Sequence, residues 1–183
     1  MAITTKTKII NLAEELIRTR GYTAFSYKDI ATVLKVKNAA IHYHFPSKEQ
    51  LGRAVLERRR RQFKEATASW ASLPYLEQLQ RLMNVYKKSQ QQQWVCLVGA
   101  LGPAYPVLPT SMQTSLTQMT LDIKTWTMAL LEEGKAAQVF NFKETIEEKS
   151  LMIVTSLLSS LIISRVMQPN STDIVIEGLL KSI

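Results

Sequence analysis

Apolar residues recur at intervals of three and four along nearly the whole 183-residue chain, and no useful stretch alternates between apolar and polar residues. A spacing of three and four places apolar side chains on one face of an α-helix, whereas a half-buried strand needs a spacing of two. The pattern therefore predicts an all-α fold with nine helices and no strands. Their expected bounds are about 5–20, 26–34, 38–44, 48–69, 74–93, 94–101, 111–133, 143–167 and 172–183.

Capping and stopping residues mark several of these bounds. Gly21 follows the first helix and suits a left-handed cap. Ser26 and Asp29 have the spacing of a capping box at the start of the second helix, and Ser47 suits the N-cap of the fourth. Gly134 is expected to follow the end of the seventh helix.

Net charge divides the chain into two parts. Residues 1–65 hold 14 Lys and Arg against 6 Asp and Glu, whereas residues 66–183 hold 9 against 9. The whole net charge of +8 therefore lies in the first third. A localised basic segment is the electrostatic footprint of a module that binds phosphates, and the neutral remainder needs another role.

Other features argue against export, membrane insertion and catalysis. One cysteine, Cys96, excludes an intramolecular disulfide, and together with the absence of a secretory signal it favours the cytoplasm. The apolar stretch 151–167 carries five hydroxyl side chains and Arg165, so we expect a buried or dimer-forming helix there. His42 and His44, two apart on a helix, point apart, which leaves no metal site. No catalytic constellation or cofactor motif is present, so we expect neither an enzyme nor a cofactor.

Two short helices joined by residues 35–37 have the layout of a helix-turn-helix. Residues 21–51, GYTAFSYKDIATVLKVKNAAIHYHFPSKEQL, strongly resemble the DNA-binding domain of the TetR family of bacterial repressors. The residues that carry the resemblance are Gly21, Phe25, Ser26, Ile30, Ala31, Val36, Ala39, Ala40, Ile41, His42, Tyr43, His44, Phe45, Pro46, Ser47, Lys48 and Leu51. The resemblance implies a helix-turn-helix domain at 1–47, a connecting helix at 48–69, and a helical ligand-binding and dimerisation domain at 70–183.

The third helix is narrow at Ala39 and carries hydrogen-bond donors, as a helix in a major groove requires. Asn38 is the candidate for base recognition because an amide pairs bidentately with adenine, although a helix cap is the alternative. Tyr43, His44 and Lys48 match the family's phosphate-contacting positions. The expected DNA-binding residues are Lys28, Lys37, Asn38, Ala39, His42, Tyr43, His44 and Lys48.

Two residues depart from the family pattern in the turn. Lys35 stands where the family usually has Gly, and Lys37 where it often has Ser, so the turn is expected to carry left-handed strain and to lack one cap. Each replacement adds a positive charge. The run Arg58–Arg61 spreads around its helix, and we expect it to form a solvated surface.

The neutral part holds methionines and aromatic residues that line either a core or an apolar pocket. The resemblance implies a pocket for a small, mostly apolar effector, with Met83, Tyr86, Trp94, Met119 and Trp126 as its candidate lining. The last two helices are expected to pair with a second copy as a four-helix bundle. The candidate interface residues are Ser156, Ser159, Ser160, Ile163, Ile174 and Leu179.

The sequence thus predicts a cytoplasmic, homodimeric transcriptional regulator, a repressor that a small effector releases from a palindromic operator. Its expected partners are double-stranded DNA, the effector and a second copy of the chain, without a membrane. The alternative is a basic peripheral membrane or adaptor protein without sequence-specific DNA binding, since surface charge alone also attracts anionic lipid.

Overall fold

The computed structural model describes residues 4–167 and 170–183, which form nine α-helices, one 3₁₀-helix and no strand. The all-α prediction is therefore confirmed. The helices are α1 (Thr5–Arg20), α2 (Tyr27–Leu34), α3 (Asn38–His44), α4 (Lys48–Trp70), α5 (Tyr75–Gln91), α6 (Leu97–Leu101), the 3₁₀-helix η1 (Gly102–Val107), α7 (Thr110–Ala136), α8 (Ile146–Val166) and α9 (Ser171–Lys181).

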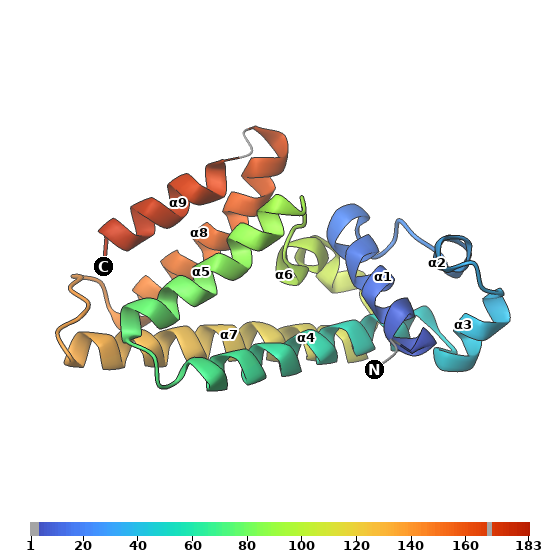
Figure 1. Cartoon of the computed structure of the whole chain (residues 1–183), viewed down its shortest axis with the longest axis horizontal. Helices are drawn as coiled ribbons and strands as arrows, with labels where there is room; N and C mark the ends of the chain where they lie inside the picture. Colours follow the sequence, from blue (N-terminus) through green and yellow to red (C-terminus); the bar gives the residue numbers. More distant parts are fainter. Residues whose placement is uncertain (1–3, 168–169) are drawn as a thin grey trace.

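The three N-terminal helices lie at one end of an elongated molecule (Figure 1). Helices α4 and α7 run side by side along its length, and α5, α8 and α9 lie at the opposite end (Figure 1). Because α4 begins beside α3 and ends at the turn into α5, it runs from one end of the molecule to the other.

Buried apolar side chains form two clusters. The first joins α1–α4 to α6 and the first half of α7, and the second joins α5 to α8 and the end of α7. The first cluster extends to Met119, so the N-terminal helices share one core with part of the C-terminal body. Helix α7 contributes to both clusters and holds them together. The domain boundary at residues 47–70 stays a prediction.

Local capping follows the sequence closely. The Ser26 backbone N–H and hydroxyl both donate to Asp29 Oδ2 at 2.7 Å, and these bonds lower the pKa of that carboxyl. The Gln50 N–H donates to Ser47 Oγ at 3.2 Å. Gly21 has φ +94° and ψ 161°, which is a region open almost only to glycine and not the left-handed helical region that the sequence suggested.

The prediction that Gly134 follows the end of the seventh helix is wrong. Helix α7 continues to Ala136, and Gly134 lies within it, beneath the buried Phe140. A Cβ at position 134 would lie 2.2 Å from Phe140 Cδ2, closer than any real contact. The glycine therefore permits an aromatic ring to pack against the helix backbone, and the left-handed residue after the helix is Gln138, with φ +57°.

The expected sixth helix begins later than predicted, at Leu97. The Trp94 N–H donates to Ser89 O at 2.9 Å, and the Val95 N–H donates to Arg18 O at 3.2 Å. Because both donors are used by other elements, residues 94–96 remain extended between α5 and α6. The bond from Val95 to Arg18 joins residues far apart in the sequence and leaves no local signal there.

Within the described ranges, α8 is the one helix that is long and apolar enough to cross a membrane by length and composition. About a third of its apolar window is buried inside the protein, where it packs against α5, α6, α7 and α9. Its Ile153, Leu157 and Leu161 belong to the second cluster. Part of α8 is thus a core helix, while its other face remains exposed.

Arg165, near the end of α8, joins three elements. One of its Nη atoms donates to Arg18 O at 2.9 Å and to Gln93 O at 2.7 Å, and the other approaches Thr19 O at 3.4 Å. The carbonyls at 18 and 19 belong to the last turn of α1, where a positive charge is favourable. This side chain therefore ties the end of α8 to the N-terminal helices and to the connection after α5.

Candidate nucleic-acid interface

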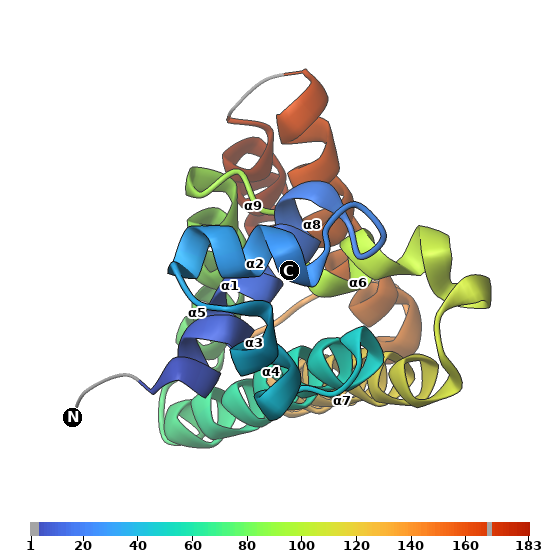
Figure 2. The ribbon, with the colours of Figure 1, turned by 90° about the vertical axis from the view of Figure 1, so that its right-hand side faces the viewer.

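Helices α2 and α3 lie at the outer end of the molecule, with α3 facing away from the body (Figure 2). The inner side of α3 is held by Ile41 and Phe45, which are both buried. The Tyr27 hydroxyl donates to Phe45 O at 2.8 Å and fixes the end of α3 against α2. Burial raises the pKa of Tyr27 to about 12, so this donor stays protonated at physiological pH.

The outer side of α3 is exposed and carries most of the predicted DNA-binding side chains. Asn38, Ala39 and His42 are exposed, and Tyr43 is 84% exposed. Tyr43 is the most exposed large apolar side chain among the described residues, and an aromatic ring so exposed is available to a partner surface. Tyr43 also stacks edgewise on the half-buried His44, with ring centres 5.2 Å apart.

The turn between the helices confirms both expected departures. Lys35 adopts the left-handed conformation, with φ +54° and ψ +44°, and its N–H bonds back to the carbonyls of α2. Lys37 is the N-cap residue of α3 and makes no side-chain cap bond. Asn38 is therefore the first residue inside α3, which excludes the helix cap as its role and leaves its amide available.

Charge on this face is positive. Between Lys28 and Lys48 the only acidic residue is Asp29, whose carboxylate is engaged by Ser26. The side chains of Lys28, Lys35 and Lys37 are exposed. A face on which lysines outnumber carboxylates meets the electrostatic requirement for binding a phosphate backbone.

Lys48 is placed differently from the other predicted contacts. Its ammonium donates to the Phe25 carbonyl and lies 4.2 Å from the centre of the Phe25 ring and 4.8 Å from that of Tyr22. Burial lowers the pKa of this amine. The side chain thus holds α4 against the segment before α2, and its phosphate contact stays a prediction that requires the ammonium to leave this position.

The expectation that Arg58–Arg61 form a solvated surface is wrong for three of the four residues, since Arg59, with a side chain 33% exposed, also lies 3.4 Å from Glu14. Arg58 reaches across to α1, where it donates to Asn11 Oδ1 at 2.5 Å and pairs with Glu14 at 2.6 Å. Arg60 pairs with Asp122 of α7 at 2.5 Å. Only Arg61, with a side chain 67% exposed, matches the expectation fully. These pairs fasten α4 to its two neighbours.

A small cavity of about 80 Å³ lies between α1, α4, α5, α6 and α7. Of the five predicted pocket residues, Tyr86 and Met119 line it. Met83 and Trp126 instead belong to the second cluster, where Trp126 packs against the rings of Phe63 and Trp70. Trp94 packs on the Arg18 guanidinium, 4.6 Å from its ring centre. Sequence reasoning missed Arg18 and Arg59, which also line the cavity.

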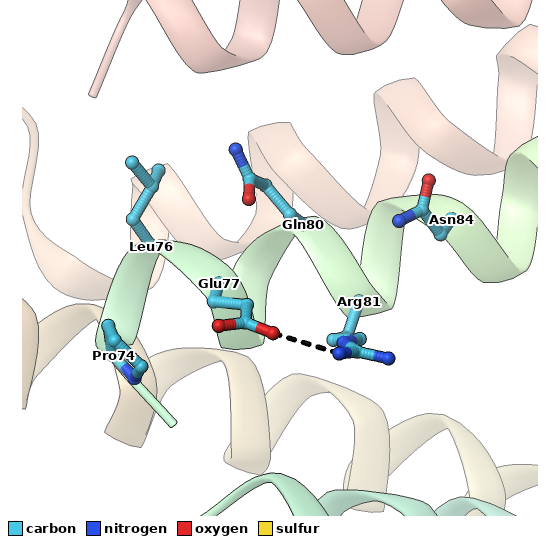
Figure 3. Close-up of a pocket in the computed structure, with 6 residues that line it drawn as sticks. All are labelled: Pro74, Leu76, Glu77, Gln80, Arg81 and Asn84. Carbon is cyan, nitrogen blue, oxygen red and sulfur yellow. Dashed lines mark hydrogen bonds and ion pairs between the residues drawn. The ribbon is translucent and has the colours of Figure 1, made fainter.

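A larger hollow, shown in Figure 3, lies on the outer side of α5. It is lined by Pro74, Leu76, Glu77, Gln80, Arg81 and Asn84, all from the N-terminal half of one helix and its cap. Glu77 and Arg81 pair with each other at 2.8 Å (Figure 3). Because a single helix supplies every wall, this hollow does not enclose a ligand.

A shallow groove separates α8 from α9. Five of the six predicted interface residues line it, namely Ser156, Ser159, Ser160, Ile163 and Leu179, and Ser160 lies buried with its hydroxyl donating to Leu157 O. The sixth, Ile174, is 58% exposed on α9. Other large apolar side chains are exposed on α8, namely Leu151, Met152, Ile162 and Val166. This surface is apolar over much of its length.

Among residues 4–167 and 170–183, no group of three His, Cys, Asp or Glu side chains is arranged to hold a metal ion. Cys96 accepts a bond from the Gly99 N–H at 3.4 Å, and burial raises the pKa of its thiol. A neutral, hydrogen-bonded thiol agrees with a packing role for this residue.

An exposed basic helix-turn-helix at the end of an all-helical body defines the class of helix-turn-helix DNA-binding regulators. Residues 9–55 match the family described as bacterial regulatory proteins, tetR family. Residues 9–55 therefore belong to the DNA-binding domain of this family, as the resemblance predicted. None of the curated proteins matches its sequence.

Solved structures agree over nearly the full length of the chain. A TetR transcriptional regulator from Legionella pneumophila is 29% identical, with 99% of this chain and 96% of that one covered and a TM-score of 0.84. A TetR-family regulator from Agrobacterium tumefaciens is 24% identical, with 97% and 96% covered and a TM-score of 0.91. A transcriptional regulator from Saccharomonospora viridis in complex with choline is 21% identical, with 96% and 93% covered and a TM-score of 0.75.

Proposed function

We propose that this protein is a cytoplasmic, homodimeric repressor that binds a palindromic operator and is released from it by a small effector. The observation that carries the proposal is the outer face of α3, where exposed polar side chains lie among lysines and the one nearby carboxylate in segment 28–48, Asp29, accepts hydrogen bonds from Ser26. The match of residues 9–55 to the tetR family of regulatory proteins supports the same proposal.

In this proposal α3 enters the major groove of DNA. Asn38, exposed at the first position of the helix, pairs with a base edge, and Ala39 and His42 lie beside it. Lys28, Lys37, Tyr43 and His44 contact phosphates and fix the orientation of α3. Lys48 joins them only after releasing the Phe25 carbonyl.

Dimerisation follows from the exposed apolar surface of α8 and α9. Single exposed apolar residues are ordinary, but several large ones exposed along α8, beside a groove shared with α9, mark an interaction site. Pairing α8 and α9 with the same helices of a second copy buries this surface in a four-helix bundle. The two copies of α3 would then meet successive major grooves, about 34 Å apart.

The cavity between α1 and α7 is the proposed effector site, with Tyr86 and Met119 among its walls. It contacts both α1 and α4, so a ligand there acts where the N-terminal helices meet the body. The choline complex from S. viridis supports a small-molecule site in a protein of this fold, while at 21% identity it leaves the ligand of this chain open.

Selection of DNA fragments by the purified protein tests the proposal. We expect a palindromic sequence to be enriched. Asn38→Ala should relax the preference at one base position and cost about 1–3 kcal/mol of binding free energy. Lys28→Ala should weaken binding to all sequences and reduce the slope of log affinity against log salt concentration by about 1. Lys143→Ala, which removes an exposed charge from the body, is the matched control and should leave affinity unchanged.

Two results would contradict the proposal. The first is that Lys28→Ala in α2 and Asn38→Ala in α3 both bind the operator as tightly as the wild type does. The second is the absence of any enriched sequence together with strong binding to anionic vesicles, which would favour the alternative of a peripheral membrane or adaptor protein. Sedimentation that shows a stable monomer at micromolar concentration would remove the dimer from the mechanism.

A further inference from the structure

Three arginines surround one buried carboxylate at the junction of α1 and α4. Glu14, only 5% exposed, lies 3.2 Å from Arg18, 2.6 Å from Arg58 and 3.4 Å from Arg59. One negative charge against three positive charges leaves an excess of two, and the side chains of Arg18 and Arg58 are only 5% and 14% exposed. Such an excess is costly unless a further anion balances it.

Hydrogen bonding shows the same shortage of negative or accepting groups. Arg18 uses its three nitrogens on Val95 O, Glu14 and Ser89 Oγ. The buried Nε–H of Arg58 has no acceptor among the described residues. Burial and the neighbouring Arg59 lower the pKa of Arg18, which again indicates uncompensated positive charge.

The cavity opens beside this cluster, and Arg18 and Arg59 form part of its wall. Its remaining wall is mostly apolar and comes from Phe63, Leu82, Val85, Leu97, Val98, Met119 and Ile123. Arg59 is the less committed of the two arginines: its side chain is a third exposed, one Nη donates to Gln62 at 3.2 Å, and its Nε only approaches Glu14.

Polar groups on the other walls are donors or are already occupied. Tyr86 lines the cavity, and burial raises the pKa of its hydroxyl, so this group stays protonated and can donate a hydrogen bond. Ser89 Oγ accepts from Arg18 and donates to Val85 O. The nearest acidic residue of α7, Asp122, is paired with Arg60 and Lys64. Among the described residues, no carboxylate lines the cavity.

We propose that the effector of this protein is a compact amphipathic anion, a monocarboxylate whose apolar chain fills the cavity and whose carboxylate binds Arg59 and the Tyr86 hydroxyl. The inference rests on the proposed function and names the class of its ligand. An apolar chain matches the apolar walls, and the carboxylate supplies the negative charge and the acceptors that the cluster lacks.

The same geometry provides a route from ligand to DNA. Glu14 belongs to α1 and Arg59 to α4, so their attraction helps to hold the N-terminal helices on the connecting helix. A ligand carboxylate competes with Glu14 for Arg59. Binding therefore weakens one of the contacts between α1 and α4. It thereby changes the orientation of the helix-turn-helix relative to α4.

Calorimetric titration of the full chain with matched probes tests this assignment. Straight-chain carboxylates from butanoate to decanoate are compared with their amides and with trimethylammonium compounds of the same chain length. We expect at least one carboxylate to bind at least tenfold more tightly than its amide, and the cations not to bind. A bound carboxylate should also raise the unfolding temperature, because it binds only the folded state.

Variants of α4 locate the binding charge. Arg59→Gln should lower carboxylate affinity at least tenfold while leaving amide affinity unchanged, and Arg59→Lys should restore part of the loss. Arg61→Gln is the matched control, because Arg61 lies two residues after Arg59 and its side chain is exposed. This variant loses the same charge and should bind the carboxylate like the wild type. Circular dichroism verifies that each variant is folded.

The outcomes separate the two proposals. Equal affinity for carboxylates and amides, binding of none of the carboxylates, or an unaffected Arg59→Gln variant would overturn the ligand assignment. Release of a selected operator by a neutral or cationic compound would also overturn it and leave the repressor proposal standing. If no operator is selected, the repressor proposal fails, and carboxylate binding that depends on Arg59 still establishes an anion site in the cavity.

Discussion

Replacing Lys35 separates the backbone strain in the turn of the helix-turn-helix from the positive charge that this residue adds to the proposed DNA face. Lys35 is left-handed, with φ +54° and ψ +44°, and its side chain is exposed. A non-glycine residue in this conformation costs about 1–2 kcal/mol. Glycine removes that cost but loses about 0.4–1 kcal/mol through its more flexible unfolded chain. Lys35→Gly should therefore stabilise the protein by about 0.5–1 kcal/mol.

The same substitution removes one positive charge from the proposed DNA face. We expect operator affinity to fall in spite of the higher stability, and the dependence of log affinity on log salt to become shallower by up to about 1. For a chain of this size, the stability gain corresponds to a rise of roughly 1–4 °C in unfolding temperature. Thermal denaturation and binding titrations over a range of salt concentrations measure the two effects.

Two further variants assign each effect to its cause. Lys35→Ala removes the charge and keeps the left-handed strain, so it should weaken DNA binding without stabilising the fold. Lys35→Asn removes the charge and tolerates the left-handed region, so its stability should lie between those of the Ala and Gly variants. If Lys35→Gly proved no more stable than Lys35→Ala, the strain argument would be refuted.

Three other substitutions give separate expectations. Gly134→Ala should destabilise the protein by about 1–3 kcal/mol through overlap with Phe140, and adding Phe140→Leu should reduce the loss, as chemical denaturation would reveal. Lys37→Ser should add the missing cap of α3 and stabilise by about 0.5–2 kcal/mol; no gain in thermal denaturation would contradict the cap assignment. Arg60 lowers the pKa of Asp122, so this pair stabilises the fold above about pH 4 and its contribution is lost as the pH falls through the lowered pKa. Asp122→Asn should lose up to about 1 kcal/mol at neutral pH and converge with the wild type in acid; a constant difference across the pH range would contradict this.

Local rules predicted most helix bounds because the residues that decide them lie within three or four positions of each other. The Ser26–Asp29 box and the Ser47 cap are examples. Gly134 shows where such rules fail. A glycine after a long amphipathic stretch looks like a helix terminator, but its role here is set by Phe140, which reaches back over the helix backbone.

The face of α3 was predictable because its exposed residues lie within one short segment. The arginines of α4 were not, because their partners are distant in the sequence: Glu14 lies 44 positions from Arg58, and Asp122 lies 62 positions from Arg60. A helical projection shows that such side chains point in different directions, but it does not show what they meet. The charged wall of the cavity escaped prediction for the same reason.

Arg165 has a consequence for how this protein tolerates mutation. All three of its acceptors are main-chain carbonyls, at positions 18, 19 and 93. Side chains at those positions can be exchanged without removing an acceptor, provided that the backbone keeps its path. Of the four residues in this link, only Arg165 contributes its side chain, so among random variants loss-of-stability substitutions at position 165 should recur while Thr19 and Gln93 tolerate exchange as far as this link is concerned. Arg18 stays constrained by its own side-chain bonds to Val95, Glu14 and Ser89.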